Sequence, residues 1–239
     1  MKQSLQKKFK SSNKSLKQLQ VEDIFSKISH KYDFMNDIMS FGLHRFWKDE
    51  FVSLMNLKKN HLILDLASGS GDLIKLIKKK YNCTCIAYDS SMEMLKESKL
   101  KNDFNNFFLI NGRAERLPFK GMSFDAVTVS FGIRNFTDIE KSLFEIKRVL
   151  KKKGRLYCLE FSQINNLYLR KVFDFYSYVI PFYGKFFLKN KDAYSYLIES
   201  IKSFPNQIQL TKKFIDAGFK DVEVIDILDG LASIHICEL

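Results

Sequence analysis

The sequence predicts an α/β fold, with a mostly parallel, doubly wound sheet that ends in an antiparallel hairpin. From residue 61 onward, short apolar runs rich in β-branched and aromatic residues alternate with amphipathic stretches at helical spacing. This alternation is typical of successive β–α–β units. Near the C-terminus, two strand-like runs at 222–228 and 231–237 are separated only by Asp229-Gly230. That dipeptide suits a two-residue type I′ turn, so the last two strands are expected to pair antiparallel.

The elements follow one another in chain order. The strand-like runs cover residues 62–67, 83–89, 107–111, 124–131 and 155–161. The helical stretches between them cover residues 72–81, 92–101 and 138–150. Before this alternation, residues 21–57 carry apolar positions at helical spacing, which predicts an N-terminal helical cap.

An aromatic-rich insertion separates the fifth strand from the hairpin. Residues 162–205 have no strand pattern but contain many of the chain's 23 Phe and 10 Tyr residues. Two interpretations stay open: ordinary helical core packing, or a lid over an apolar substrate pocket at the carboxyl edge of the sheet. In both cases residues 21–239 form a single domain.

The basic charge of the chain is concentrated at its start. The formal net charge is +12, and residues 1–20 carry six lysines and no acid, which is half of the excess. Their polar, low-complexity composition predicts a disordered basic tail rather than an arm for nucleic acid. The tail has neither the apolar core of a secretory signal nor the arginines of a mitochondrial presequence.

The cysteines and the apolar runs exclude two further classes of protein. Cys83, Cys85, Cys158 and Cys237 lie in strand-like segments, so we expect reduced core thiols and no metal site. Because no uninterrupted apolar run reaches about 18 residues, no membrane-spanning helix is expected. The sequence predicts a soluble or at most peripheral protein.

A glycine loop follows the first strand. In Ser68-Gly69-Ser70-Gly71 the two glycines permit a tight turn that opens onto a helix N-terminus. Asp65 lies four residues before Gly69, which favours a partly cationic ligand such as S-adenosylmethionine over a pyrophosphate. The alternative is an ordinary strand-to-helix turn without a ligand.

Later strand ends supply further candidate ligand contacts. Asp89 ends the second strand, where a carboxylate accepts hydrogen bonds from both ribose hydroxyls of a nucleoside, although it also suits a helix N-cap. The loop after the third strand brings the backbone of Arg113 and Ala114 to an adenine ring. Together with the antiparallel hairpin, these features favour a Rossmann-like, class I S-adenosylmethionine-dependent methyltransferase over a dinucleotide-binding protein.

The loop after the fourth strand lies opposite the glycine loop in such a sheet. It contains Arg134 and Asn135, which we expect to face the group that accepts the methyl. An arginine at this point stabilises an anion, and the alternative for Arg134 is a surface salt bridge. The Asp/Asn/Ser-Pro-Pro-Tyr/Phe tetrad common in methyltransferases that act on nucleobase nitrogens is absent from the chain.

Three stretches carry a family resemblance. They are residues 31–48 (KYDFMNDIMSFGLHRFWK), 130–138 (SFGIRNFTD) and 192–205, which begins DAYSYLIES and ends in Phe-Pro. Together they resemble the ubiquinone/menaquinone biosynthesis C-methyltransferase family. The resemblance implies S-adenosylmethionine as methyl donor and a ring carbon of a prenylated quinol as acceptor.

Carried over residue by residue, the resemblance places the donor against Ser70, Asp89, Arg113, Ala114 and Ser130. The chain departs from the family pattern at two of these places. Arg113 stands where the family usually has Asn or Asp, so a side-chain contact to adenine is in doubt while the backbone contact stays. Ser70 replaces a Thr of the usual Gly-Gly-Thr-Gly loop and keeps its hydroxyl group.

The chemistry implied by the resemblance requires an electron-rich ring carbon. We expect Arg134, with a hydrogen bond from Asn135, to stabilise the phenolate of the acceptor, and Asp33 and His44 are candidates for accepting its proton. Two other functions stay open: methylation of a different apolar small molecule, or quinone binding without turnover.

The resemblance also sets expectations about surroundings. Because the prenyl tail is hardly water-soluble, we expect a cytoplasmic protein with peripheral contact at the inner face of the membrane or with a quinone-biosynthesis complex. The mitochondrial matrix stays open as an alternative location. No nucleic-acid partner is expected, and the sequence makes no prediction of the oligomeric state.

Overall fold

The computed structural model describes residues 32–102, 104–176 and 191–239. The predicted basic tail at 1–20, the first part of the predicted cap at 21–31 and the middle of the predicted lid at 177–190 lie outside the described residues.

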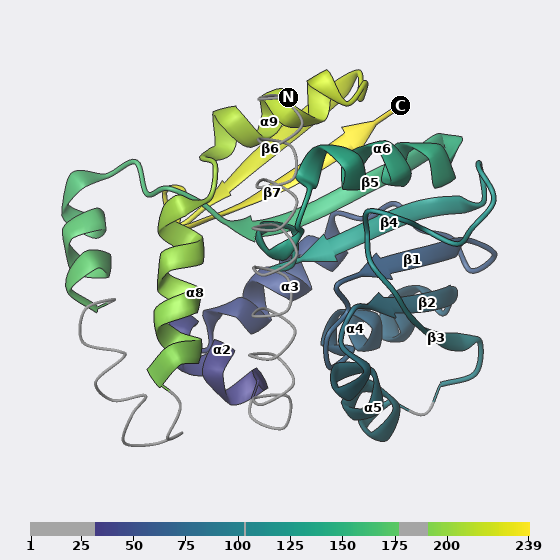
Figure 1. The fold of residues 1–239 in the computed structure, drawn as a ribbon, viewed down its shortest axis with the longest axis horizontal. Coiled ribbons are helices and arrows are strands. Elements are labelled where there is room, and N and C mark those ends of the chain that lie inside the picture. Colours follow the sequence, from purple (N-terminus) through teal and green to yellow (C-terminus); the bar gives the residue numbers. More distant parts are fainter. Residues whose placement is uncertain (1–31, 103, 177–190) are drawn as a thin grey trace, which may run out of the picture.

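One seven-stranded sheet forms the centre of the described structure (Figure 1). Its order is β3-β2-β1-β4-β5-β7-β6, with the first five strands of the chain parallel and β7 antiparallel to both β5 and β6. The predicted fold class is therefore confirmed. The strands are β1 (Leu62–Leu66), β2 (Thr84–Asp89), β3 (Phe107–Asn111), β4 (Phe124–Ser130), β5 (Leu150–Phe161), β6 (Asp221–Ile227) and β7 (Ala232–Glu238).

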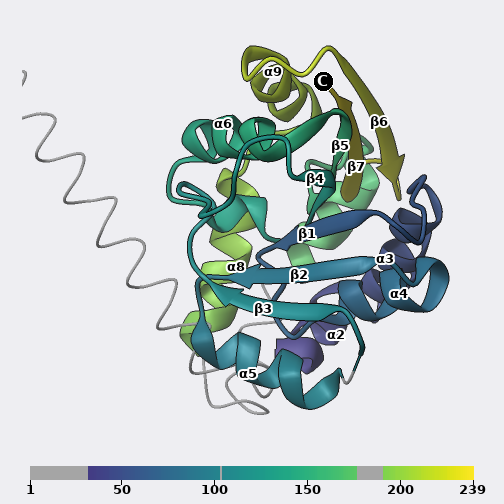
Figure 2. The same ribbon diagram turned by 90° about the vertical axis from the view of Figure 1, so that its right-hand side faces the viewer.

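Helices cover both faces of the sheet. They are α2 (Tyr32–Ser40), α3 (Leu43–Ser53), α4 (Asp72–Tyr81), α5 (Met92–Lys101), the short 3-10 helix η2 (Ile133–Asn135), α6 (Ile139–Val149), α8 (Lys191–Ser203) and α9 (Gln207–Asp216). Helices α3 and α4 pack into one hydrophobic cluster and α6 and α9 into another. Figure 2 shows these two pairs on opposite sides of the sheet.

Side chains from alternate positions of each strand contribute to the two hydrophobic clusters. In β1, Ile63 belongs to the cluster under α3 and α4, whereas Leu64 belongs to the one under α6 and α9, because successive side chains of a strand point to opposite faces. The four cysteines also belong to these two clusters. All four are buried free thiols within these clusters, as predicted.

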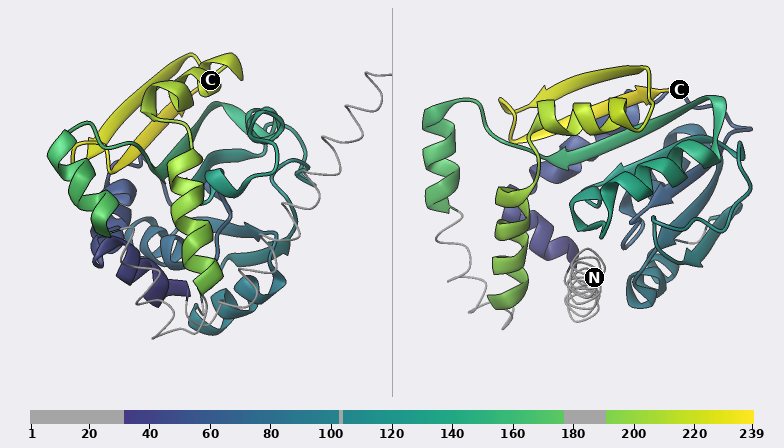
Figure 3. Two further views of the ribbon diagram at one scale, coloured as in Figure 1. Left: turned by 60° about the vertical axis from the view of Figure 1, so that its left-hand side comes forward. Right: turned by 45° about the horizontal axis from the view of Figure 1, so that its top comes forward.

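The described parts of the aromatic insertion pack at the carboxyl end of the sheet. Residues 167–176 form a helix, and α8 stands beside α2 in both views of Figure 3. Tyr176 stacks on Phe41 with the ring centroids 4.1 Å apart, and its hydroxyl donates to the carbonyl of Ile38. Leu197 and Ile201 of α8 are buried in the core. The described residues of the insertion therefore include true core positions.

Strand β5 begins five residues earlier than predicted. Its first residue, Leu150, pairs with Phe124, and a register shift separates this pair from Ala126 and Arg155. The three lysines at 151–153 lie outside the predicted strand run, which begins at residue 155. They are tolerated in the strand because they lie on the exposed side or at its margin, and Lys151 pairs with Asp125 at 2.8 Å.

The predicted two-residue turn of the C-terminal hairpin is wrong. The last pair of the ladder is Ile227 with Ala232, so the connection has four residues. Leu228 and Asp229 both have positive φ, at 46° and 56°, and the amide of Gly230 donates to the carbonyl of Ile227. Asp229 is held from outside the hairpin, because its carboxylate accepts from the amide of Asn166 at 2.6 Å. This tertiary contact shifts the turn by one residue.

Among the described helices, none has the length and apolar character required to cross a membrane.

The backbone conformation of this turn predicts the effect of one substitution on stability. Leu228 is half-exposed and adopts the left-handed conformation, which costs a branched residue about 1–2 kcal/mol and asparagine less. We expect Leu228→Asn to raise the free energy of unfolding by about 0.5–1 kcal/mol in urea titrations. The matched control, Val224→Asn in the extended part of β6, should lower it. A loss of stability in Leu228→Asn would contradict the four-residue turn.

Candidate active site

A pocket opens at the carboxyl ends of the parallel strands. It encloses about 750 Å³ of space, part of which is open solvent. Five of the predicted site residues line it: Gly69, Asp89, Arg113, Ala114 and Asn135. The structure therefore brings the ends of β1, β2, β3 and β4 together around one cavity.

The glycine loop forms one wall of this pocket. Gly69 and Gly71 have φ values of 56° and 82°, in the left-handed region that glycine adopts without strain. A Cβ at Gly71 would collide with the side chains of Ser98 and Asn102 on and just after α5. Gly71 therefore sets the turn and the close approach of α5 to the loop, whereas Gly69 lies on the pocket wall.

Asp89 joins the glycine loop to the end of β2. Its Oδ2 accepts from the amide of Gly69 and its Oδ1 accepts from the amide of Ser91, both at 2.8 Å. The N-cap of α5 is Ser91, whose hydroxyl accepts from the amide of Met94, so the helix-cap alternative for Asp89 is wrong. Asp89 lies on the pocket wall, and a carboxylate is an acceptor of hydrogen bonds from hydroxyl donors.

Asp65 lies beneath the loop. It is buried, and its Oδ1 accepts from the hydroxyl of Thr128 at 2.6 Å. Its Oδ2 is also buried but has no hydrogen-bond partner among the described residues. Removal from water disfavours the charged form, so burial raises the pKa of Asp65 to about 7.

Ser70 and Ser130, predicted to contact the donor, also lie behind the pocket wall that the described residues form. Ser70 donates to Asp72 at 2.6 Å, and Asp72 in turn pairs with Lys48 of α3 at 2.7 Å. The Ser130 hydroxyl is buried at the end of β4 and has no partner within the described part of the chain. Asp65 and Ser130 thus each carry an unused buried oxygen close to the loop.

Arg134 is anchored from β5. Its guanidinium forms an ion pair with the carboxylate of Glu160, and both side chains are almost fully buried. The same carboxylate accepts from the amide of Phe161 at 2.9 Å. Burial raises the pKa of Glu160, while the charge of Arg134 opposes that shift. The surface salt bridge weighed for Arg134 is therefore wrong, because this pair is buried.

The guanidinium has one donor to spare. Arg134 Nε is buried and has no hydrogen-bond partner in the described ranges. Among the described residues, Arg134 does not line this pocket, unlike its neighbour Asn135, but it borders a second cavity together with Phe136, Thr137 and Tyr196. Glu160 was missed by the sequence reasoning; its signal was a lone acid within the otherwise apolar run 156–161 at the end of β5.

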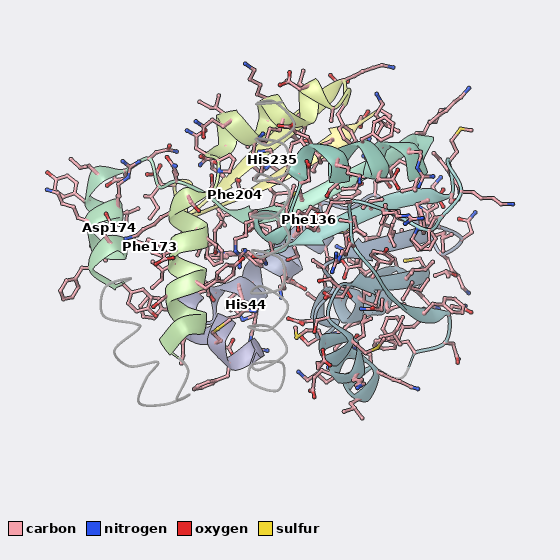
Figure 4. All side chains as sticks on the ribbon, in the orientation of Figure 1. His44, Phe136, Phe173, Asp174, Phe204 and His235 are labelled. Carbon is pink, nitrogen blue, oxygen red and sulfur yellow. The ribbon has the colours of Figure 1, made fainter. Side chains whose placement is uncertain are left out.

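Asn135 ends the short helix η2 and faces the pocket. Its Oδ1 accepts a hydrogen bond from the hydroxyl of Tyr196, at 2.9 Å, across from α8. Phe136 and Thr137 continue the wall, and Figure 4 shows Phe136 beside the start of α6. These two residues and Tyr196 were also missed as site residues.

The two candidate bases lie on the N-terminal helices. His44 is buried on α3, as Figure 4 shows, with Nε2 2.9 Å from Asp37 Oδ1. Burial is the main cause that lowers the pKa of His44, so its neutral form is favoured. Asp33 lies within α2, but its side chain is outside the described set. The roles of both residues stay predictions.

The strand order, the antiparallel hairpin and the pocket above a glycine loop define the class of S-adenosylmethionine-dependent methyltransferases. Solved structures agree with this class. A chain in the complex between the Trm112 methyltransferase activator of Haloferax volcanii and a methyltransferase matches with a TM-score of 0.69 and 17% identity, covering 91% of this chain and 96% of that one. A SAM-dependent methyltransferase from Thermotoga maritima matches with a TM-score of 0.65 and 18% identity, covering 91% of this chain and 99% of that one.

The family follows from closer relatives. The model of the ubiE/COQ5 methyltransferase family matches residues 13–238. The ubiquinone/menaquinone biosynthesis C-methyltransferase UbiE of Rickettsia bellii is 44% identical over 238 residues, 95% of each chain. UbiE of Rickettsia massiliae is 45% identical over 229 residues, 92% of each. The chain belongs to the ubiE/COQ5 methyltransferase family and is a methyltransferase, as the resemblance implied.

The buried carboxylate of Asp65 should make the free energy of unfolding depend on pH. Its pKa in the folded protein, about 7, is higher than the ordinary value of ~3.9 in an unfolded chain. Between pH 4 and 7 the folded state therefore holds a proton that the unfolded state has lost. The free energy of unfolding falls as pH rises through this window, by about 4 kcal/mol at most, and levels off above it.

We expect Asp65→Asn to abolish this part of the pH dependence in urea titrations at pH 5 and pH 8. Asn keeps an acceptor for Thr128 but carries no charge to desolvate. The control is Asp221→Asn on the exposed start of β6, which should retain the wild-type difference. Equal pH dependence in the wild type and Asp65→Asn would show that Asp65 is not the group responsible.

Proposed function

We propose that this methyltransferase transfers the methyl group of S-adenosylmethionine to a ring carbon of a prenylated quinol in ubiquinone or menaquinone biosynthesis. The acceptor is demethylmenaquinol or 2-polyprenyl-6-methoxy-1,4-benzoquinol. The observation that carries this proposal is the identity of 44% along 95% of the chain with proteins named ubiquinone/menaquinone biosynthesis C-methyltransferases.

The residues of the pocket fit the methyl donor. Asp89 offers carboxylate oxygens for the ribose hydroxyls, and Met94 and Phe136 provide apolar surface for the adenine ring. At the charged end of the donor, the unpartnered Oδ2 of buried Asp65 is complementary to an ammonium group. The backbone of Arg113 and Ala114 lies on the same wall and supplies polar groups for the ring edge.

The reaction demands that the acceptor carbon become nucleophilic while water is kept away. When bound, S-adenosylmethionine supplies an electrophilic methyl group. Lowering a phenolic pKa from ~10 by about 3 units requires ~4 kcal/mol of differential stabilisation. A desolvated guanidinium donor and an amide donor supply energies of this order. The proposed donors to the acceptor oxygen are Arg134 Nε, which is buried without a partner among the described residues, and the side-chain amino group of Asn135.

A turnover assay tests the proposal. The purified full-length protein, given S-adenosylmethionine and reduced demethylmenaquinol, should yield S-adenosylhomocysteine and a quinol heavier by one methylene group in mass spectrometry. The benzoquinol, a sterol and a polyketide serve as competing acceptors. If the protein binds S-adenosylhomocysteine but methylates neither quinol, the proposed acceptor is wrong. If it does not bind S-adenosylhomocysteine, the proposed use of S-adenosylmethionine as methyl donor is wrong.

The role of Arg134 is tested within this assay. We expect Arg134→Ala to lower kcat by about a hundredfold, equivalent to ~2.7 kcal/mol, because a charged donor to the developing phenolate is lost. The affinity for S-adenosylhomocysteine, measured by calorimetry, should stay within about threefold because Arg134 lies off the donor pocket wall formed by the described residues.

The control separates chemistry from folding. Arg134→Ala leaves Glu160 buried without its partner, which is itself destabilising. The double variant Arg134→Met/Glu160→Gln removes both charges and relieves that penalty. It should regain thermal stability but not activity. Recovery of wild-type turnover in the double variant would show that Arg134 has only a structural role.

We further propose peripheral contact with a membrane that holds the prenylated acceptor. The helix at 167–176 supports it, because Tyr168, Val172 and Phe175 recur at helical spacing and are each at least 66% exposed. Lys171 is exposed on the same helix, where it complements anionic lipid headgroups. Phe173 and Asp174 mark this helix at the outer edge of the molecule in Figure 4.

Vesicle sedimentation tests the contact. Phe175→Glu should weaken binding to vesicles of anionic phospholipid at least tenfold, since burial of a Phe side chain is worth ~1.5–3 kcal/mol. Ile208→Glu, at an 80% exposed site on α9, is the matched control and should bind as the wild type does. Equal binding by the wild type and both variants would show that the helix at 167–176 does not contact the membrane.

A further inference from the structure

The side chain of Asn135 has two chemically different ends. One end is a carbonyl oxygen that only accepts hydrogen bonds, and the other is an amino group that only donates them. Which end faces the pocket decides whether Asn135 stabilises or repels negative charge on a bound oxygen atom. The residue lies on the pocket wall, so this orientation bears directly on the reaction.

Tyr196 of α8 selects the orientation. Its hydroxyl donates to Oδ1 of Asn135 at 2.9 Å. If the side-chain amide of Asn135 were flipped, its amino group would face the Tyr196 hydroxyl. Two hydrogen-bond donors would then lie opposite each other unless the hydroxyl hydrogen of Tyr196 rotated away. With Oδ1 occupied by Tyr196, the Nδ2 amino group is the end left for the pocket.

Both partners of this hydrogen bond are held in place. The amide of Asn135 donates to the carbonyl of Gly132 at 3.0 Å, which fixes the turn of η2. On the other side, Leu197, next to Tyr196, is buried in the core, so α8 cannot slide freely. The neighbouring Arg134 is anchored separately by Glu160. The pair therefore joins two elements that are each fixed by independent contacts.

We infer that Tyr196 is a positioning residue that turns the amino group of Asn135 toward the methyl-acceptor oxygen. This inference rests on the proposed function, in which that oxygen gains negative charge as the ring carbon becomes nucleophilic. A donor that is oriented before the reaction stabilises this charge without reorganisation. Tyr196 itself does not touch the reacting atoms; it acts through Asn135.

The first test removes only the hydroxyl. Tyr196→Phe should lower kcat about tenfold, which corresponds to ~1.4 kcal/mol. The KM for reduced demethylmenaquinol and the calorimetric affinity for S-adenosylhomocysteine should both stay within twofold of the wild type. Unchanged kcat would overturn the inference while leaving the proposed function intact, since the wild-type turnover tests that function separately.

A matched control comes from a tyrosine away from the pocket. Tyr81 is likewise partly buried, and its hydroxyl is a hydrogen-bond donor whose acceptors are the main-chain carbonyls of Val52 and Met55 rather than a side chain of the pocket. Tyr81→Phe should lower the unfolding temperature but retain wild-type kcat. An equal loss of kcat in both variants would mean that general destabilisation, rather than orientation of Asn135, explains the effect.

A double-mutant cycle closes the argument. In an Asn135→Ala background the Tyr196 hydroxyl has no amide left to orient, so adding Tyr196→Phe should change kcat by less than twofold. A further tenfold loss in that background would show that Tyr196 acts independently of Asn135 and would overturn the inference. Thermal unfolding of all four proteins confirms that each is folded at the assay temperature.

Discussion

The reversal of strand order at β1 is the constraint on which the site depends. Strands β2 and β3 lie on one side of β1, and β4 and β5 lie on the other. The connections that leave β1 and β4 therefore diverge, and a crevice opens at the carboxyl ends between them. Because all five strands are parallel, the segments that follow the first four of them meet at that crevice. The hydrogen bond from the Gly69 amide to Asp89 ties two of these segments together and sets their spacing.

The buried polar groups around this crevice are difficult to justify on stability alone. Asp65 is buried with one oxygen unpartnered in the described structure, and Glu160 and Arg134 form an ion pair out of contact with water. Replacing such groups by apolar ones of similar size is often neutral or stabilising. Their placement beside the pocket, rather than at random in the core, fits groups that are retained for binding and chemistry. Asp72 and Lys48 extend the same pattern, with α3 anchoring the start of α4 behind the glycine loop.

The sequence predicted best those elements whose signal is local. The helix bounds at 72–81 and 92–101 and the strand at 107–111 agree with the structure, because the residues that define each element, such as the N-cap Ser91 of α5, lie within it or next to it. The glycine loop and Asp89 were placed correctly for the same reason: each stands at a fixed distance from a strand end. The turn at 228–231 was wrong because Asp229 is held by Asn166, far away in the sequence. Glu160 and Tyr196 were missed because their importance lies in partners on other elements, which no local pattern reveals.

The helix η2 shows how such distant contacts complete a site. Its two polar residues are each held by a different element, Arg134 by β5 and Asn135 by α8. The strand belongs to the parallel part of the sheet, whereas α8 belongs to the aromatic insertion. A short segment of three residues has too few contacts of its own to fix two side chains, so their orientation depends on both neighbours. It follows that the insertion contributes to the site: through Tyr196 it determines which chemical group of Asn135 the pocket presents.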